Sequence, residues 1–236
     1  MVMKQIAATN RILVFAPHPD DDVLGCGGSI AWHVEQGHQI KIVYLTSGES
    51  GSLEISKTEL AALRESEALA AARTLGVKET EFLHWPDGYL MVEPEYLLKL
   101  TSLIREEKPH RVYLPHSQDA VRDHLVTHRL VIEAMRRAAG PWFQECLLEP
   151  WSVATALGYE IWTPILSPGL ALDISNFMIK KIAALNEHRS QLEGFRYDDA
   201  ITGLNRYRAV MNSRYEYCEC FQLIKTREVM DQPAYE

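Results

Sequence analysis

The chain has 236 residues, of which 47% are apolar and 24% charged, with a formal net charge of −8 at pH 7. This length suits one α/β domain with a sizeable core, and the acidic balance provides no basic surface for nucleic acid or an anionic membrane. No apolar run approaches the ~18 residues of a membrane span, and the N-terminus lacks the apolar centre of a secretory signal. We therefore expect a cytoplasmic protein with reduced thiols at Cys26, Cys146, Cys218 and Cys220.

Strands and helices are predicted to alternate over the first 140 residues. Short apolar runs predict strands at 11–16, 39–46, 81–85 and 111–115. Longer amphipathic segments predict helices at 25–37, 56–76, 96–109 and 124–140. The second helix has the clearest ends, since Ser56 and Glu59 form a capping-box pattern and Gly76 a C-cap. Such alternation is typical of βαβ units and a parallel sheet.

The last third of the chain is less regular. Strands are predicted at 153–162, 169–174 and 217–224, and one helix at 175–193. No change of composition marks a linker, and no repeat is present. We therefore expect a single domain over 1–236, of which 141–236 is the less regular part.

Three polar clusters follow predicted strands at their carboxyl ends, where open parallel sheets bind ligands. The first cluster runs from His18 to Asp22, and the second is Trp85-Pro86-Asp87-Gly88. The third cluster consists of His116, Asp119, Asp123, His124 and His128. Because these strand ends share one edge of the sheet, the clusters are expected to converge on one site.

Histidine and aspartate in these positions suit Zn²⁺, which binds imidazole nitrogen and carboxylate oxygen and keeps one position for water when it is catalytic. Three protein ligands would be His18, one of the following acids, and His124. A neighbouring carboxylate that is not a ligand would then accept a proton from the water. The pattern predicts a zinc hydrolase site.

Each cluster also has a structural interpretation. The acids at 20–22 suit a turn or the first turn of a helix, and Asp123 suits the N-cap of a helix beginning at 124. A lone pair such as His124 and His128 is common on surfaces and in cores. HLVTH lacks the Glu of the HExxH motif, and the glycines at 25–28 do not fit G-x-G-x-x-G, so a zincin site and a dinucleotide site are both disfavoured.

Six motifs follow one another between residues 11 and 193. They are PHPDDDVLGCGG (17–28), TSGESG (46–51), Arg64 with Glu67, WPDGYL (85–90), Asp123-His124, and KIAALNEHRSQ (181–191). Together and in this order they resemble the motifs of the LmbE-like, or PIG-L, family of zinc-dependent N-acetylglucosaminyl deacetylases.

The resemblance implies a Rossmann-like, three-layer α/β sandwich with a mostly parallel sheet. It implies removal of an N-acetyl group from a small GlcNAc-type sugar or conjugate, with one Zn²⁺ or another divalent ion per chain. By position, the metal ligands would be His18, Asp21 and His124, and the general base Asp20. Substrate contacts would come from Arg64, Trp85, Asp87 and His188. A homo-oligomer is compatible with this assignment, whereas nucleic acid is not an expected partner.

Two positions depart from the family pattern. Asp22 replaces the usual Glu, which keeps the charge and shortens the side chain. Val121 occupies the first His of H-x-D-H, which in relatives stabilises the oxyanion and helps to protonate the amine. A donor of this kind is typically worth about 100- to 1000-fold in rate. Either another group replaces it, or activity is weak, or the substrate differs. The candidate replacements are His116, Arg122, His128 and His188, among which we expect His128.

Several alternatives remain open at this point. Arg64 could form a surface pair with Glu67, and Trp85 could pack against the core. The protein could be a zinc amidohydrolase for a non-sugar acylated amine, or a sugar- or nucleotide-binding relative that has lost activity. A two-metal phosphoesterase is a weaker alternative, because it needs more ligands than the sequence offers.

Overall fold

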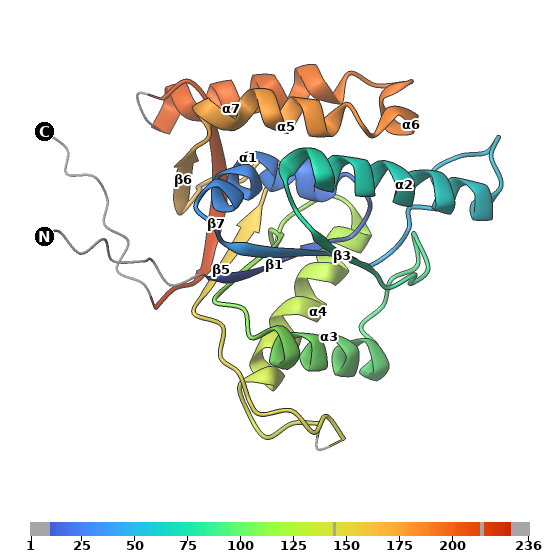
Figure 1. The fold of residues 1–236 in the computed structure, drawn as a ribbon, viewed down its shortest axis with the longest axis vertical. Helices are drawn as coiled ribbons and strands as arrows, with labels where there is room; N and C mark the ends of the chain where they lie inside the picture. Colours follow the sequence, from blue (N-terminus) through green and yellow to red (C-terminus); the bar gives the residue numbers. More distant parts are fainter. Residues whose placement is uncertain (1–9, 144, 213–214, 228–236) are drawn as a thin grey trace, which may run out of the picture.

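A seven-stranded sheet forms the centre of the computed structural model, which describes residues 10–143, 145–212 and 215–227 (Figure 1). The strand order is β3-β2-β1-β4-β5-β7-β6, and β1 to β5 are all parallel to their neighbours, whereas β7 is antiparallel to both β5 and β6. The strands are β1 (Arg11–Ala16), β2 (Gln39–Tyr44), β3 (Glu79–Phe82), β4 (Arg111–Pro115), β5 (Thr155–Tyr159), β6 (Leu170–Asp173) and β7 (Cys218–Lys225).

Helices cover both faces of this sheet. They are α1 (Asp21–Glu35), α2 (Lys57–Leu75), α3 (Pro94–Glu107), α4 (Arg122–Ala138), η1 (Ser175–Phe177), α5 (Met178–Leu185), α6 (Arg189–Leu192) and α7 (Tyr197–Asn212). Figure 1 shows α3 and α4 on one face and α1 and α2 on the other. On this second side α5 packs on α1 and α2, and α7 packs on β7 next to α5. The expected α/β fold with a mostly parallel sheet is confirmed.

The strands are apolar along their whole length because both faces of the sheet are covered. In β1, Ile12 and Val14 join the core on the α1 side, while Leu13 and Phe15 join the core on the α3 side. All four side chains are buried. Such double-sided packing fixes where β1 ends, and therefore where the polar residues that follow it are placed.

The first helix begins four residues earlier than expected. Its first turn contains Asp21 and Asp22, and it is kinked at Cys26, whose φ of −146° is not helical. The glycines of this segment allow close packing, since a Cβ at Gly25 would lie 2.2 Å from Tyr159 and one at Gly28 would lie 2.7 Å from Ile174. The glycine-rich stretch thus lets a helix start tightly against the sheet.

The kink frees two backbone N–H groups that a regular helix would pair. The carboxylate of Glu219 accepts both of them, from Gly28 and Ser29, at 2.8 Å each. Lys181, which is fully buried, donates to the same carboxylate at 2.7 Å. This buried ion pair therefore ties α1 to α5 and β7 just behind the polar loop.

Other element boundaries also differ from expectation. The helix predicted over 175–193 is broken into η1, α5 and α6, and α7 was not predicted at all. The helix that follows β4 starts at Arg122 with Val121 as its N-cap residue, so the expected N-cap role of Asp123 is wrong. The capping box of α2 is confirmed: Ser56 Oγ accepts the N–H of Glu59, and Gly76 closes the helix with φ 89°.

The described residues include no helix with the length and apolar character that crossing a membrane requires.

Candidate metal centre and active site

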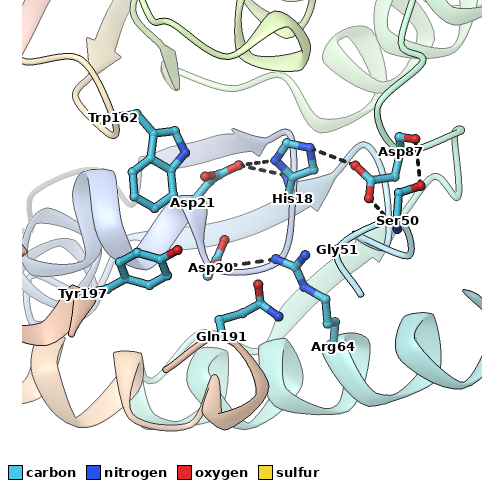
Figure 2. A pocket seen from close by; sticks show the side chains of 10 residues that line it. All are labelled: His18, Asp20, Asp21, Ser50, Gly51, Arg64, Asp87, Trp162, Gln191 and Tyr197. Atoms are coloured by element: carbon cyan, nitrogen blue, oxygen red, sulfur yellow. Dashed lines mark hydrogen bonds and ion pairs between the residues drawn. The ribbon is translucent and has the colours of Figure 1, made fainter. Parts of the chain in front are cut away.

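A cavity of about 300 Å³ opens at the carboxyl ends of the parallel strands (Figure 2). The residues that line it come from the loops after β1, β2, β3 and β5 and from the four helices α1, α2, α6 and α7. They are His18, Asp20, Asp21, Ser50, Gly51, Arg64, Asp87, Trp162, Gln191 and Tyr197.

Three neighbouring side chains could hold one metal ion: His18 and Asp21, which line this cavity, and the fully buried His124. Oδ2 of Asp21 lies 3.0 Å from Nδ1 of His18 and 3.3 Å from Nε2 of His124. Metal–ligand distances of roughly 2.0–2.2 Å in a tetrahedral shell separate neighbouring ligand atoms by about 3.3 Å. The spacing of these three residues therefore fits a tetrahedral ion.

The hydrogen bonding of His124 supports the same conclusion. This imidazole is fully buried, and neither ring nitrogen makes a well-aligned hydrogen bond, although each lies 3.3 Å from a carboxylate oxygen. Buried polar atoms are almost always paired, so such an arrangement calls for an explanation. An ion between Asp21 and Nε2 of His124 would satisfy both groups.

In both His18 and His124, one ring nitrogen faces Asp21, and the other ring nitrogen faces a second carboxylate. Oδ1 of Asp87 lies 3.1 Å from Nε2 of His18, and Oδ1 of Asp119 lies 3.3 Å from Nδ1 of His124. Metal-binding histidines usually donate their second N–H to such a partner, which fixes the ring and raises its basicity. Asp119 is thus a functional candidate that the sequence placed in the third cluster but gave no role.

A second, overlapping group could also hold an ion. His18, Asp87 and Asp123 offer atoms close together, and Oδ2 of Asp123 lies 3.5 Å from Nε2 of His18. His18 cannot give one nitrogen to both a hydrogen bond and an ion, so this group competes with the first. The first group is favoured because it includes His124, whose buried ring nitrogens make no aligned hydrogen bond and would gain a partner in the ion.

Electrostatics around the imidazoles favour positive charge. Burial lowers the pKa of His124, but Asp21 and Asp119 outweigh it and raise the value to about 9. Burial opposes ionisation of Asp21, yet His124 and His18 hold its pKa well below the usual range. A divalent cation would take the place of the protons that these groups otherwise bind.

Asp20 is held in an unusual conformation beside this centre. Its φ of 116° is in a region that non-glycine residues avoid, a strain of about 1–3 kcal/mol that is typical of functional positions. Burial is the largest effect on its carboxyl group and raises the pKa to about 7, although Arg64 opposes this. A buried carboxylate that titrates near neutrality is suited to act as a general base.

Arg64 is directed at the site from α2. Its guanidinium donates to the carbonyls of Pro19 at 2.7 Å and Gly48 at 3.1 Å, and lies 3.4 Å from Asp20 Oδ2. The alternative of a surface pair with Glu67 is wrong, because both residues are buried and Glu67 accepts hydrogen bonds from Ser190. Arg64 therefore supports the loop that carries Asp20.

One wall of the cavity is aromatic. Trp162 and Tyr197 meet edge to face, with ring centroids 5.0 Å apart, and Figure 2 shows both rings on the side opposite Asp87 and Ser50. Phe195 stacks on Tyr197 at 5.5 Å. None of these aromatic residues was expected from the sequence, since α7 was not predicted and Trp162 was assigned to a strand.

Several expected site residues do not line this cavity. Nδ1 of His128 donates to the carbonyl of Pro115 at 2.8 Å, and Trp85 stacks on Tyr96 with centroids 3.8 Å apart. His188 is fully buried with no aligned hydrogen bond, and burial, followed by Arg64, lowers its pKa to about 3. The catalytic role of His128 stays a prediction that this geometry does not support.

Two comparisons identify the group of proteins to which the chain is similar. The model of the PIG-L family, described as GlcNAc-PI de-N-acetylase, matches residues 13–135. The diacetylchitobiose deacetylase of Thermococcus kodakarensis is 33% identical over 190 residues, covering 77% of this chain and 70% of that protein.

Solved structures extend the likeness over nearly the whole fold. N,N'-diacetylchitobiose deacetylase from Pyrococcus horikoshii aligns with a TM-score of 0.85 and 28% identity, covering 95% of this chain and 87% of that chain. GalB, the 4-carboxy-2-hydroxymuconate hydratase from Pseudomonas putida KT2440, aligns with a TM-score of 0.81 and 25% identity, covering 95% and 100%. The expected resemblance and the expected reaction class of the relatives, amide hydrolysis, are confirmed, and the chain belongs to the PIG-L family of deacetylases.

Proposed function

We propose that this protein is a zinc-dependent N-deacetylase that hydrolyses the acetamide of a small GlcNAc-type sugar or conjugate, with one metal ion per chain. The observation that carries this proposal is the group His18, Asp21 and His124, of which His18 and Asp21 line a cavity that the carboxylate of Asp20 also lines. The activities of the relatives support the same reaction class.

The chemistry divides between the ion and the side chains. Zinc, when bound, polarises the acetamide carbonyl and lowers the pKa of water toward about 7. Asp20 accepts the proton of the water that attacks the carbonyl, because its carboxylate lines the cavity and titrates near neutrality. Arg64 holds the Pro19 carbonyl and keeps the Asp20 carboxylate in place.

The amine that leaves must receive a proton, and the developing oxyanion needs a donor. Valine at 121 supplies neither, and in the described part of the chain His18 is the only imidazole that lines the cavity. Protonated Asp20 returns its proton to the amine. The hydroxyl of Tyr197 faces Asp20 across the cavity and donates to the oxyanion in place of the missing histidine (Figure 2).

The two walls of the cavity suit a pyranose ring. A sugar has one face of C–H groups, which packs on aromatic rings, and hydroxyl groups that require polar partners. Trp162 and Tyr197 provide the aromatic wall, and Ser50, Asp87 and Arg64 form the polar side. This pairing supports a sugar over a small aliphatic acylated amine.

Hydration of a carbon–carbon double bond is a second candidate, for one specific reason. Addition of water releases no amine, so the reaction does not need the proton-donating histidine that this chain lacks at position 121, where it has Val121. A hydratase also occurs among the similar structures.

The cytoplasmic location and the homo-oligomer expected from the sequence stay predictions.

A substrate screen on the zinc-loaded protein tests the proposal. The assay measures released amine and acetate from N-acetylglucosamine, N,N'-diacetylchitobiose, other GlcNAc conjugates and non-sugar acetylated amines, and hydration of unsaturated dicarboxylic acids. We expect stoichiometric amine and acetate from at least one GlcNAc compound. Turnover only of non-sugar amides, only of unsaturated acids, or of no compound despite bound zinc would contradict the proposal.

A further inference from the structure

Gln191 lines the cavity, but the proposed reaction gives it no role. It is the last residue of the motif KIAALNEHRSQ and lies in the short helix α6. Figure 2 shows its amide group between Tyr197 and Arg64, with the amide oxygen pointing toward Asp20. A substrate in the cavity would therefore meet one end of this amide beside Asp20.

Three hydrogen bonds fix which end of the amide that is. The buried carboxylate of Glu67 on α2 accepts the backbone N–H of Ser190 at 2.8 Å and the hydroxyl of Ser190 at 2.7 Å. A serine hydroxyl has a single proton, so Oγ of Ser190 can only accept from any further partner. Nε2 of Gln191 donates to this oxygen at 3.0 Å. A reversed amide would set two acceptors against each other, so the NH₂ group faces Ser190 and the oxygen faces the cavity.

The amide oxygen of Gln191 is left without a donor from the protein. Among residues 10–143, 145–212 and 215–227, no group donates to Oε1 of Gln191. The nearby guanidinium of Arg64 donates instead to the carbonyls of Pro19 and Gly48. Asp20 offers acceptor oxygens when it is ionised and cannot satisfy a second acceptor. This part of the cavity therefore suits an N–H or O–H group of the substrate.

The proposed reaction places one particular donor there. Hydrolysis adds water to the acetamide carbonyl and breaks the C–N bond, and the proton that Asp20 takes from the water passes to the nitrogen. That nitrogen must lie within reach of Asp20, on the side toward which Oε1 of Gln191 points (Figure 2). The nitrogen keeps its own hydrogen throughout, so it is a donor in the bound amide, in the transition state and in the free amine.

We propose that Gln191 is a specificity-determining residue whose amide oxygen accepts the N–H of the substrate's acetamide, an inference that rests on the proposed deacetylase function. The nitrogen gains positive charge as it is protonated, so its N–H is a stronger donor in the transition state than in the bound amide. An acetate ester has no hydrogen on the corresponding oxygen. Gln191 therefore favours secondary amides as substrates and gives no advantage to esters.

A pair of substrates tests this role. The first is the GlcNAc compound that the wild type hydrolyses, and the second is its analogue with oxygen in place of the acetamide nitrogen. Gln191→Met keeps the length of the side chain and removes the acceptor. We expect kcat for the amide to fall by about 10- to 100-fold, the usual effect of a hydrogen bond to a charged group, while kcat for the ester changes by less than about twofold.

Gln36→Met alters an exposed glutamine at the end of α1 and is the matched control, which should act on both substrates as the wild type does. Retained ester hydrolysis shows that Gln191→Met is folded and holds its metal. Wild-type kcat for the amide in Gln191→Met would overturn the inference. An equal loss with amide and ester would also overturn it, because Gln191 would then act on the site as a whole or on a sugar hydroxyl. A wild-type protein that releases no amine would contradict the proposed function itself, and this inference with it.

Discussion

The carboxylate of Asp119 lies 3.3 Å from Nδ1 of His124, while the other nitrogen of the same ring faces Asp21 at 3.3 Å. The same carboxylate accepts the backbone N–H groups of Val121 at 2.9 Å and Trp162 at 3.2 Å. Asp119 therefore orients a proposed metal ligand and also fixes the loop that carries one aromatic wall of the cavity.

This relationship predicts the effect of Asp119→Asn. Loss of the negative charge makes His124 a weaker ligand, and partners of this kind are worth about 10- to 100-fold in metal affinity. Competition with a chelator of known affinity measures the change. Asp173→Asn, an exposed carboxylate on β6, is the matched control and should bind zinc as the wild type does. Equal affinity in Asp119→Asn would show that the carboxylate does not act through His124.

Asp20→Asn tests the proposed base. The variant should keep a normal zinc content, because Asp20 is not among the three proposed ligands, while kcat falls by about 100- to 10,000-fold, the usual contribution of general base catalysis. Metal analysis and the amine-release assay are made on the same preparation. A variant with full zinc and wild-type kcat would remove the base assignment.

Tyr197→Phe tests the donor that replaces the histidine absent at Val121. Removing one oxyanion donor costs about 100-fold or more in kcat, whereas the retained ring should leave KM nearly unchanged. Tyr207→Phe on the same helix alters an exposed hydroxyl and is the control. If both variants retain wild-type kcat, the hydroxyl of Tyr197 takes no part in the reaction.

Asp22→Asn tests the charge balance behind the metal loop. Asp22 is fully buried, and burial is the main reason that its pKa rises to about 7. At pH values between the ordinary pKa of 3.8 and the raised pKa of about 7, the Asp22 carboxyl is protonated in the folded protein and ionised in the unfolded chain. The stability of the metal-free protein should therefore fall as the pH rises through this range and level off above it.

The variant carries no such titration, so its stability should depend less on pH. We expect Asp22→Asn to melt at a higher temperature than the wild type at pH 8. A gain in stability of 1 kcal/mol raises the melting temperature by about 2–4 °C at this chain length, and we expect a rise of at least this size. Thermal melting of both proteins between pH 5 and 8 provides the comparison. Parallel curves for the two proteins would mean that Asp22 does not bind a proton in the folded state over this range.

The sequence predicted the parallel part of the sheet and the proposed metal ligands. Hydrophobic periodicity places His18 and His124 after predicted parallel strands, and the structure shows that these strands, β1 and β4, are adjacent. The choice of Asp21 among the three acids came from the resemblance to the family. The acids at 20–22 were harder to interpret, because a turn and a helix start share the same residues. The structure shows that α1 begins at Asp21, so the last two of these acids belong to the helix and Asp20 precedes it.

The aromatic wall and the role of Asp119 could not be predicted in this way. Tyr197 stands at the start of α7, a helix that packs mainly on β7 and also contacts α5 and β6. No local pattern shows that this segment returns to the carboxyl edge of the sheet. Whether Asp119 meets Nδ1 of His124 depends likewise on the orientation of a ring, which is set by contacts distant in sequence.

The most direct test of the metal centre is anomalous diffraction from crystals of the zinc-loaded protein, recorded above and below the zinc absorption edge. The proposed ligand set predicts one peak per chain, within bonding distance of Nδ1 of His18, Oδ2 of Asp21 and Nε2 of His124. A peak beside Asp87 and Asp123 with none at His124, or no peak in the loaded protein, would contradict it.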